Sequence, residues 1–308
     1  MDPDKIEGLN EVQNTVYRTA LKLYSLQKLC QLHLIDVSLI ETVLLRHRPQ
    51  LQPDGTFSIP DLSLSLQVLF NRASQDNLRQ VEPRASQLTL SLLIAINDRN
   101  GTGFIPLRAA AATLIALSAD SLSAKYKALF QLAVHGSAGN HATGNQITRS
   151  NLRLLLSDLK QVPMVVSEDD AFCDVESAVR SCFQGVLNPG IPEDKFIAWC
   201  CSEPSILLWI PALYRVAATE RVTHQVKCAI CKSFPITGLR YHCLKCLNFN
   251  LCQVCFLTGQ SIKRHQGTHP VVEHCIQTSM KEEIQLLART LRNNLLGRRC
   301  RRKEAQRR

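Results

Sequence analysis

Eight of the nine cysteine and histidine residues between positions 228 and 269 constrain the fold of this chain more than any other feature of its sequence. They form four closely spaced pairs: Cys228 and Cys231, Cys243 and Cys246, Cys252 and Cys255, and His265 and His269. A short spacer lets both side chains of a pair reach one ion, and tetrahedral zinc takes four such donors. The pattern predicts two closed zinc sites whose metal binding supplies the folding free energy of a segment too short for a large core.

The spacing also predicts which pairs share an ion. Only five residues separate the second pair from the third, so we expect these pairs to bind different ions on interleaved loops. The first and third pairs, Cys228, Cys231, Cys252 and Cys255, then hold one zinc ion, and Cys243, Cys246, His265 and His269 hold the other. Four protein donors leave no coordination position open, which predicts structural rather than hydrolytic zinc. The alternative, core cysteines clustered by chance, is disfavoured by three C-x-x-C pairs at zinc spacing.

Cysteine usage and the N-terminal sequence bear on the cellular compartment. The chain has thirteen cysteines, an odd number, and begins with the polar and acidic stretch MDPDKIEGLNEV, which does not resemble a secretory signal. The run from Ala109 to Ala119 is far shorter than the roughly 20 apolar residues of a membrane span. We therefore expect a soluble, intracellular protein with reduced thiols.

Residues 10 to about 210 show helical periodicity interrupted by turn signals, which predicts repeated helix–loop–helix units of the EF-hand type. Two loops can be aligned by a glycine at position 6 and an apolar residue at position 8. The loop Asp98–Ala109 has an alanine where calcium needs a bidentate carboxylate, and the loop Gln50–Asp61 offers only Asp54 and Asp61. We expect these loops to keep the fold without binding calcium.

The C-terminal segment predicts a helix followed by a basic tail. Ser279 and Glu282 have the spacing of a capping box, and Ile284, Leu287, Leu291 and Leu295 form an apolar stripe. The stripe spans about two heptads, so the helix either opens a coiled coil or packs on the finger. From Arg289 onward nine basic residues stand against one acid, a tail that either contacts anionic lipid or is a solvated end.

Other residues favour a binding protein over an enzyme. Trp199 and Trp209 lie in an apolar helical context, where core packing is a better interpretation than a peptide groove. The sequence contains no Ser/His/Asp arrangement, paired acids or phosphate-binding glycine loop, so we expect no enzymatic activity and no small-molecule substrate. The body of the chain is nearly neutral, and we expect no binding to nucleic acid.

The cysteine-rich run, CAICKSFPITGLRYHCLKCLNFNLCQVCFLTGQSIKRHQGTHPVVEHC, resembles the ZZ-type zinc finger of the dystrophin family. The stretches RTALKLYSLQKLCQL, VESAVRSCFQ and WIPALYRVAATE also resemble the region before the finger in dystrophins and dystrobrevins. The resemblance spans residues 11–296. It implies a mainly α fold in which paired, degenerate EF-hand-like domains precede a two-zinc ZZ finger and a C-terminal helix.

We predict the domain boundaries 1–120 and 121–222 for the helical domains, 223–278 for the finger, and 279–308 for the helix and tail. The resemblance implies a non-enzymatic adaptor that binds protein partners, including members of dystrobrevin- or dystroglycan-linked complexes. It also implies peripheral association with the cytoplasmic face of the plasma membrane, including synapses. One alternative is a RING-like ubiquitin ligase, although RING fingers usually end in a cysteine pair, and another is a calcium sensor acting through the helical loops.

Overall fold

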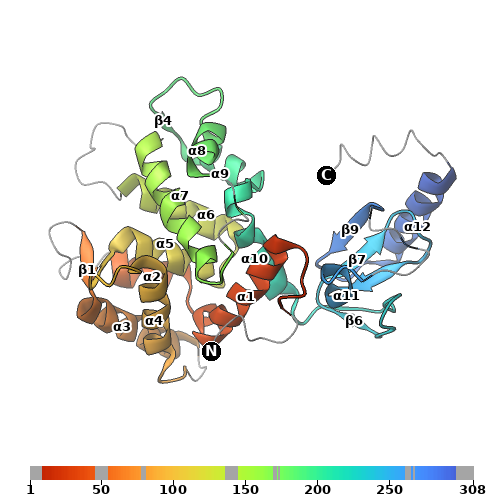
Figure 1. The fold of residues 1–308 in the computed structure, drawn as a ribbon, viewed down its shortest axis with the longest axis horizontal. Coiled ribbons are helices and arrows are strands. Elements are labelled where there is room, and N and C mark those ends of the chain that lie inside the picture. Colours follow the sequence, from red (N-terminus) through yellow and green to blue (C-terminus); the bar gives the residue numbers. More distant parts are fainter. Residues whose placement is uncertain are drawn as a thin grey trace. The chain divides into compact units, whose positions relative to one another are not determined.

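The computed structural model describes residues 9–45, 55–77, 81–135, 145–168, 172, 174–260, 265 and 268–295 (Figure 1). The chain divides into two compact units: Thr19–Tyr214 forms a helical unit, and Arg215 onward forms a finger unit together with N-terminal residues up to Arg18. Outside the described residues lie residues 50–54 of the loop Gln50–Asp61, residues 136–144 and the basic tail after residue 295. Among the described residues, no helix combines the length and apolar character needed to cross a membrane.

The helical unit consists of short helices and four two- or three-residue strands. Its helices are α1 (Thr15–Leu29, whose first turn belongs to the finger unit), η2 (Leu32–Leu34), α2 (Val37–Ile40), η3 (Glu41–Leu45), α3 (Ile59–Asn77), α4 (Ala85–Asn97), α5 (Leu107–Leu117), α6 (Leu122–His135), α7 (Arg149–Met164), α8 (Val175–Cys182), α9 (Glu193–Cys201), η5 (Ser205–Leu207) and α10 (Trp209–Thr219, whose C-terminal half belongs to the finger unit). Its strands are β1 (Thr56–Ser58), β2 (Phe104–Pro106), β3 (Ile147–Thr148) and β4 (Gly190–Ile191).

The four strands join the helix–loop–helix units into two pairs. Strand β1 pairs antiparallel with β2, and Phe57 lies opposite Ile105 in that ladder. These are the two apolar residues at position 8 of the aligned loops, and both are almost fully buried. Strands β3 and β4 pair in the same way, with Ile147 opposite Ile191. The structure therefore confirms the predicted mainly α architecture of paired EF-hand-like domains.

Helix α5 lies at the centre of the helical unit. Its sequence is rich in alanine and leucine, the residues with the highest helix propensity, and every residue from Ala109 to Leu117 is buried. At its start, the guanidinium of Arg108 donates to the carboxylate of Asp158 on α7 at 2.6 Å. Burial raises the pKa of Asp158, and the hydrogen bond from Arg108 offsets part of that effect. This ion pair links the first pair of EF-hand-like units to the second.

The finger unit is built on a small antiparallel sheet. Its strands are β5 (Thr223–His224), β6 (Ile236–Thr237), β7 (Arg240–Cys243), β8 (Asn250–Cys252) and β9 (Val271–His274), and its other elements are α11 (Gln253–Leu257) and α12 (Met280–Leu295). Strand β7 is central, with β8 on one side and β9 on the other, while β5 and β6 form a separate hairpin. The ring of Tyr241 on β7 stacks on Phe256 of α11, with 3.8 Å between centroids.

Candidate metal centre

The first cluster brings together the side chains of Cys228, Cys231, Cys252 and Cys255. The first two residues lie in the turn between β5 and β6, the third ends β8, and the fourth lies one turn into α11. All four ligand atoms lie within 4.8 Å of one another. The pairing of the first cysteine pair with the third is the one that the sequence spacing predicts.

The distance between sulfur atoms fits a tetrahedral ion. Zinc–sulfur bonds of about 2.3 Å place neighbouring sulfurs about 3.8 Å apart in a tetrahedron. The Sγ atoms of Cys231 and Cys252 are separated by 3.7 Å. The four thiols therefore form a donor set that matches zinc in chemistry and in size.

The second cluster combines Cys243, Cys246, His265 and His269, with ligand atoms again within 4.8 Å of one another. Cys243 ends β7, and Cys246 follows in the turn toward β8. The Sγ of Cys246 lies 3.6 Å from Nδ1 of His265 and 3.3 Å from Nδ1 of His269. Zinc bonds of about 2.3 Å to sulfur and about 2.0 Å to nitrogen predict roughly 3.5 Å, so this cluster also fits a zinc ion.

Backbone amides and an aromatic ring orient these donors. The amides of Lys245 and Cys246 donate to the Sγ of Cys243 at 3.4 and 3.2 Å. In the first cluster the amide of Cys252 donates to the Sγ of Cys228 at 3.4 Å. The imidazole of His265 stacks on Phe249, with 4.3 Å between ring centroids. Such outer contacts fix ligand orientation and support the negative charge that a thiolate carries.

The electrostatic environment differs among the side chains of the two clusters. Hydrogen bonds from Ser233 lower the pKa of Cys231 to about 6, which supports its thiolate form. Burial raises the pKa of Cys246 to about 11 and also raises that of Cys255, so these thiolates need a nearby positive charge. Burial lowers the pKa of His265 and His269, which keeps the imidazoles neutral and able to coordinate.

The sheet beneath the clusters is tied to the N-terminal residues of the chain. The amide of Gln13 donates to the carbonyl of Leu257 at 2.8 Å, and the hydroxyl of Tyr17 donates to the carboxylate of Glu273 on β9. Glu273 also lies 3.7 Å from the guanidinium of Arg215. Residues 9–18 are therefore part of the finger unit, although residues 19–214 separate them in the sequence from the rest of that unit.

Comparison with known proteins agrees with this geometry. Residues 222–267 match the family model of the ZZ-type zinc finger, while residues 3–118 and 122–217 match two EF-hand family models. The chain is 56% identical to dystrotelin of Homo sapiens over its whole length and 50% identical to dystrotelin of Mus musculus over 96% of its length. It is 34% identical to dystrophin isoform B of Drosophila melanogaster over 95% of its length, which is 18% of that protein.

The chain belongs to the dystrophin family. It spans about half the length of the dystrotelins it matches, 53% of the human protein and 45% of the mouse protein. Along the chain, the two EF-hand matches precede the ZZ-type match, in the order that the resemblance implied.

In the EF-hand-like loop Asp98–Ala109, the carboxylate of Asp98 accepts hydrogen bonds from other residues of the loop. Both carboxylate oxygens of Asp98 accept hydrogen bonds, from the amide and hydroxyl of Thr102 at 2.7 Å and from the amide of Gly103 at 2.8 Å. The hydrogen bonds from Thr102 lower the pKa of Asp98. At position 12, Ala109 is buried on α5 and offers no side-chain oxygen.

His274 and Cys275 follow the second histidine and also carry side chains of the kind that binds zinc. Within the described part of the chain, only the two clusters of four gather three or more metal-binding side chains, and neither residue belongs to them. His274 lies on β9 opposite Arg240, and the thiol of Cys275 lies 3.8 Å from Glu273. The structure thus brings together all eight predicted ligands, while their binding of zinc remains a prediction.

The sequence did not indicate how α12 is attached to the finger in this dystrophin-family chain. Its predicted capping box is present, because the amide of Ser279 donates to Glu282 at 2.7 Å and the amide of Glu282 donates to Ser279 Oγ at 3.3 Å. The apolar stripe, however, is not the docked face: Ile284, Leu287 and Leu291 remain exposed. Arg240 on β7 pairs with Glu283 of α12, a contact between residues 43 positions apart that no local pattern reveals.

Proposed function

We propose that this chain is a non-enzymatic, zinc-binding adaptor in which the EF-hand-like domains support a ZZ finger that docks protein partners. The observation that carries this proposal is the closure of both metal clusters by four protein donors each. A tetrahedral zinc ion with four protein ligands has no position for water or substrate, so it stabilises a surface and does not activate a reactant. Membership of the dystrophin family and the match to the ZZ-type finger support a scaffold or adaptor role.

The proposal includes two structural zinc ions per chain, one in each cluster, and no bound calcium. It also keeps the predicted boundaries of the domains at residues 120, 222 and 278. Its partners are proteins, with members of dystrobrevin- or dystroglycan-linked complexes as the specific candidates. Its place is the cytoplasmic face of the plasma membrane as a peripheral protein, with synapses as the narrower location. Family membership supports these partners and this location.

Calcium is expected to leave the stability of the chain unchanged. The loop at Asp98 lacks a carboxylate at position 12, so its calcium dissociation constant should exceed about 10 mM. At that affinity, 1 mM calcium raises the free energy of unfolding by less than about 0.1 kcal/mol. Thermal unfolding of the helical unit in 1 mM calcium and in 1 mM magnesium should give the same midpoint. A rise in the midpoint with calcium alone would support the calcium-sensor alternative.

The adaptor role is tested by comparing partners of three full-length chains in cell extract: the wild type, Cys243→Ser and Cys201→Ser. Cys243 is a buried member of the second cluster, whereas Cys201 is an exposed free cysteine of α9 and serves as the matched control. We expect quantitative proteomics to find partners that the first variant loses and the second retains. If the Cys243→Ser chain keeps every partner of the wild type, the finger is not the docking module.

A further inference from the structure

Helix α12 is held on the finger by a buried arginine. Arg240 on β7 is only 1% exposed, and its Nε donates to Asn250 Oδ1 at 2.9 Å. Its Nη1 donates to Thr278 Oγ1 at 2.8 Å and to Glu283 Oε1, and its Nη2 donates to Glu283 Oε2 at 3.1 Å. A bidentate arginine–carboxylate contact of this kind is strong and geometrically specific. The carboxylate that pairs with the buried charge of the finger therefore comes from α12.

The other end of α12 contacts a metal-binding turn. The side-chain amide of Asn293 donates to the carbonyl of Leu244 at 3.2 Å, and Leu244 lies between Cys243 and Cys246. Leu286 and Thr290 are buried between the two ends of the helix. The docked face thus carries an acid, an apolar residue, a small polar residue and an amide over about 15 Å of helix.

This docked face is mostly polar, and Ile284 and Leu291 of the apolar stripe lie outside it. Ile284 is 64% exposed and Leu291 is 46% exposed, whereas Leu286 is buried, the one large apolar side chain buried among those that the structure describes on α12. The hydrophobic contribution to docking is therefore limited largely to one leucine. Specific polar contacts from Glu283 and Asn293 therefore hold α12 on the finger.

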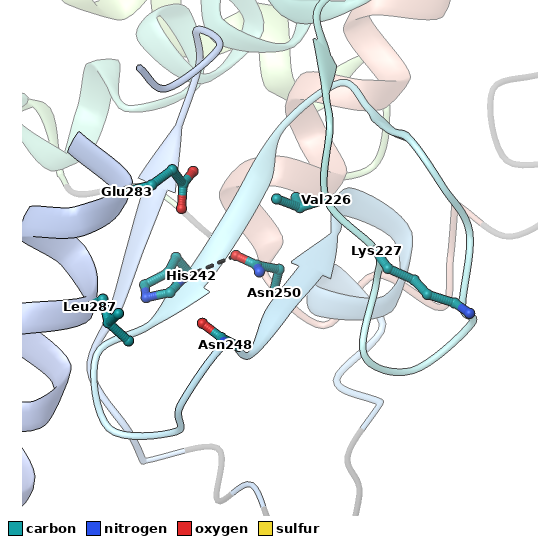
Figure 2. A pocket seen from close by; sticks show the side chains of 7 residues that line it. All are labelled: Val226, Lys227, His242, Asn248, Asn250, Glu283 and Leu287. Atoms are coloured by element: carbon teal, nitrogen blue, oxygen red, sulfur yellow. Dashed lines mark hydrogen bonds between the residues drawn. The ribbon is translucent and has the colours of Figure 1, made fainter. Parts of the chain in front are cut away.

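A pocket of about 270 Å³ beside α12 shows where this helix fits the finger incompletely. Figure 2 shows His242 and Asn250 of the finger beside Glu283 and Leu287 of α12, with the amine of Lys227 directed away from them. Asn250 Oδ1 accepts a hydrogen bond from Arg240, which identifies this atom as the amide oxygen. Nδ1 of His242 lies 2.9 Å from the same oxygen, so Nδ1 carries the proton and donates it. The neutral imidazole then presents Nε2 as an acceptor.

His242 is 96% buried, and among the described residues its Nε2 has no hydrogen-bond partner. A buried acceptor without a donor is costly, and α12 places Leu287 beside this pocket. A helix with a hydrogen-bond donor at the position of Leu287, four residues after the carboxylate, would satisfy the acceptor that α12 leaves unpaired.

We propose that the finger face formed by Arg240, His242, Leu244 and Asn250 is a helix-docking site that α12 occupies within the same chain. The partner is an amphipathic helix of another protein with a carboxylate for Arg240, a donor side chain four residues later and an amide ten residues after the carboxylate. This helix displaces α12. The inference rests on the proposed adaptor function and names the class of partner that its finger binds.

The test uses a fluorescein-labelled synthetic peptide of residues 278–295 and the full-length chain, with binding measured by fluorescence anisotropy. The chain is compared as wild type, Glu283→Gln and Glu282→Gln. The last variant removes the same charge from the neighbouring residue, and glutamine keeps the capping box. Zinc content is measured for each variant, so that loss of the finger is not mistaken for release of α12.

We expect the peptide to bind the Glu283→Gln chain at least roughly 30-fold more tightly than the wild type, because loss of the buried charge pair frees the site. The Glu282→Gln chain should behave as the wild type. A peptide carrying Glu283→Gln should lose its affinity, and one carrying Leu287→Gln should bind more tightly than the native peptide. Equal binding to all three chains, or binding that ignores Glu283 in the peptide, overturns the proposal.

The peptide-binding test and the cellular-partner test distinguish failure of the helix-docking site from failure of the adaptor role. If the peptide exchanges as expected but Cys243→Ser loses no cellular partner, the site exists and the adaptor role is wrong. If partners depend on the finger but the peptide does not discriminate at Glu283, the adaptor role stands and the helix-docking site is wrong.

Discussion

Removal of zinc by a strong chelator is expected to unfold the finger and leave the helical unit folded. The strands of the finger are only two to four residues long, and its two clusters of four ligands can each hold a metal ion. Structural zinc in such small domains contributes about 10–16 kcal/mol of apparent binding free energy, which is folding free energy when no site exists in the unfolded chain. The helical unit has its own buried core around α5 and contains none of the eight ligands.

Hydrogen exchange followed by mass spectrometry resolves the two units in one experiment. After chelation, amides of β7 and β8 should lose their protection, whereas amides of α5 should keep theirs. Addition of zinc, but not of magnesium, should restore protection in the finger, because magnesium prefers oxygen ligands. Persistent protection of β7 in the chelated chain would show that the finger folds without metal.

Trp209→Ala is expected to destabilise the helical unit by about 3–5 kcal/mol, the range found when a large buried aromatic residue is truncated. Trp209 begins α10 and is fully buried, and Trp199 on α9 is 8% exposed with its indole N–H donating to Ser181. Both tryptophans therefore lie in the core, which is the interpretation that the sequence favoured over a peptide groove. Urea unfolding followed by circular dichroism measures the loss.

The control for this prediction is Leu187→Ala, because Leu187 is fully exposed in the loop before β4. This substitution should change the free energy of unfolding by no more than about 0.5 kcal/mol. Zinc content should be the same in both variants, since neither residue lies in the finger unit. If Trp209→Ala lowers the free energy of unfolding by less than about 1 kcal/mol, Trp209 is not a core residue and the peptide-groove interpretation is favoured.

Much of this architecture follows from local sequence patterns. The spacing of the four pairs predicted which cysteines and histidines gather, because short spacers fix each pair and interleaved loops fix the partners. Glycine at position 6 and an apolar residue at position 8 predicted the loops whose apolar residues, Phe57 and Ile105, pair between β1 and β2. The capping box predicted the start of α12 near Ser279.

The contacts that attach other segments to the finger could not be predicted in the same way. Tyr17 and Glu273 are 256 residues apart, and Arg240 and Glu283 are 43 apart, so each pair depends on tertiary packing and not on local spacing. The apolar stripe of α12 was itself misleading about the docked face. Polar side chains at Glu283 and Asn293 decide that face, because they satisfy a buried guanidinium and a carbonyl.

Metal content measured by elemental analysis of the purified full-length chain tests the central claim most directly. The account predicts two zinc ions per chain for the wild type. It also predicts about one zinc ion when Cys243 and Cys246 are both replaced by serine, with the first cluster still loaded, and two in the Cys201→Ser control. A wild-type chain that contains no zinc, or a double variant that keeps both ions, would contradict the assignment of these eight residues to two structural zinc sites.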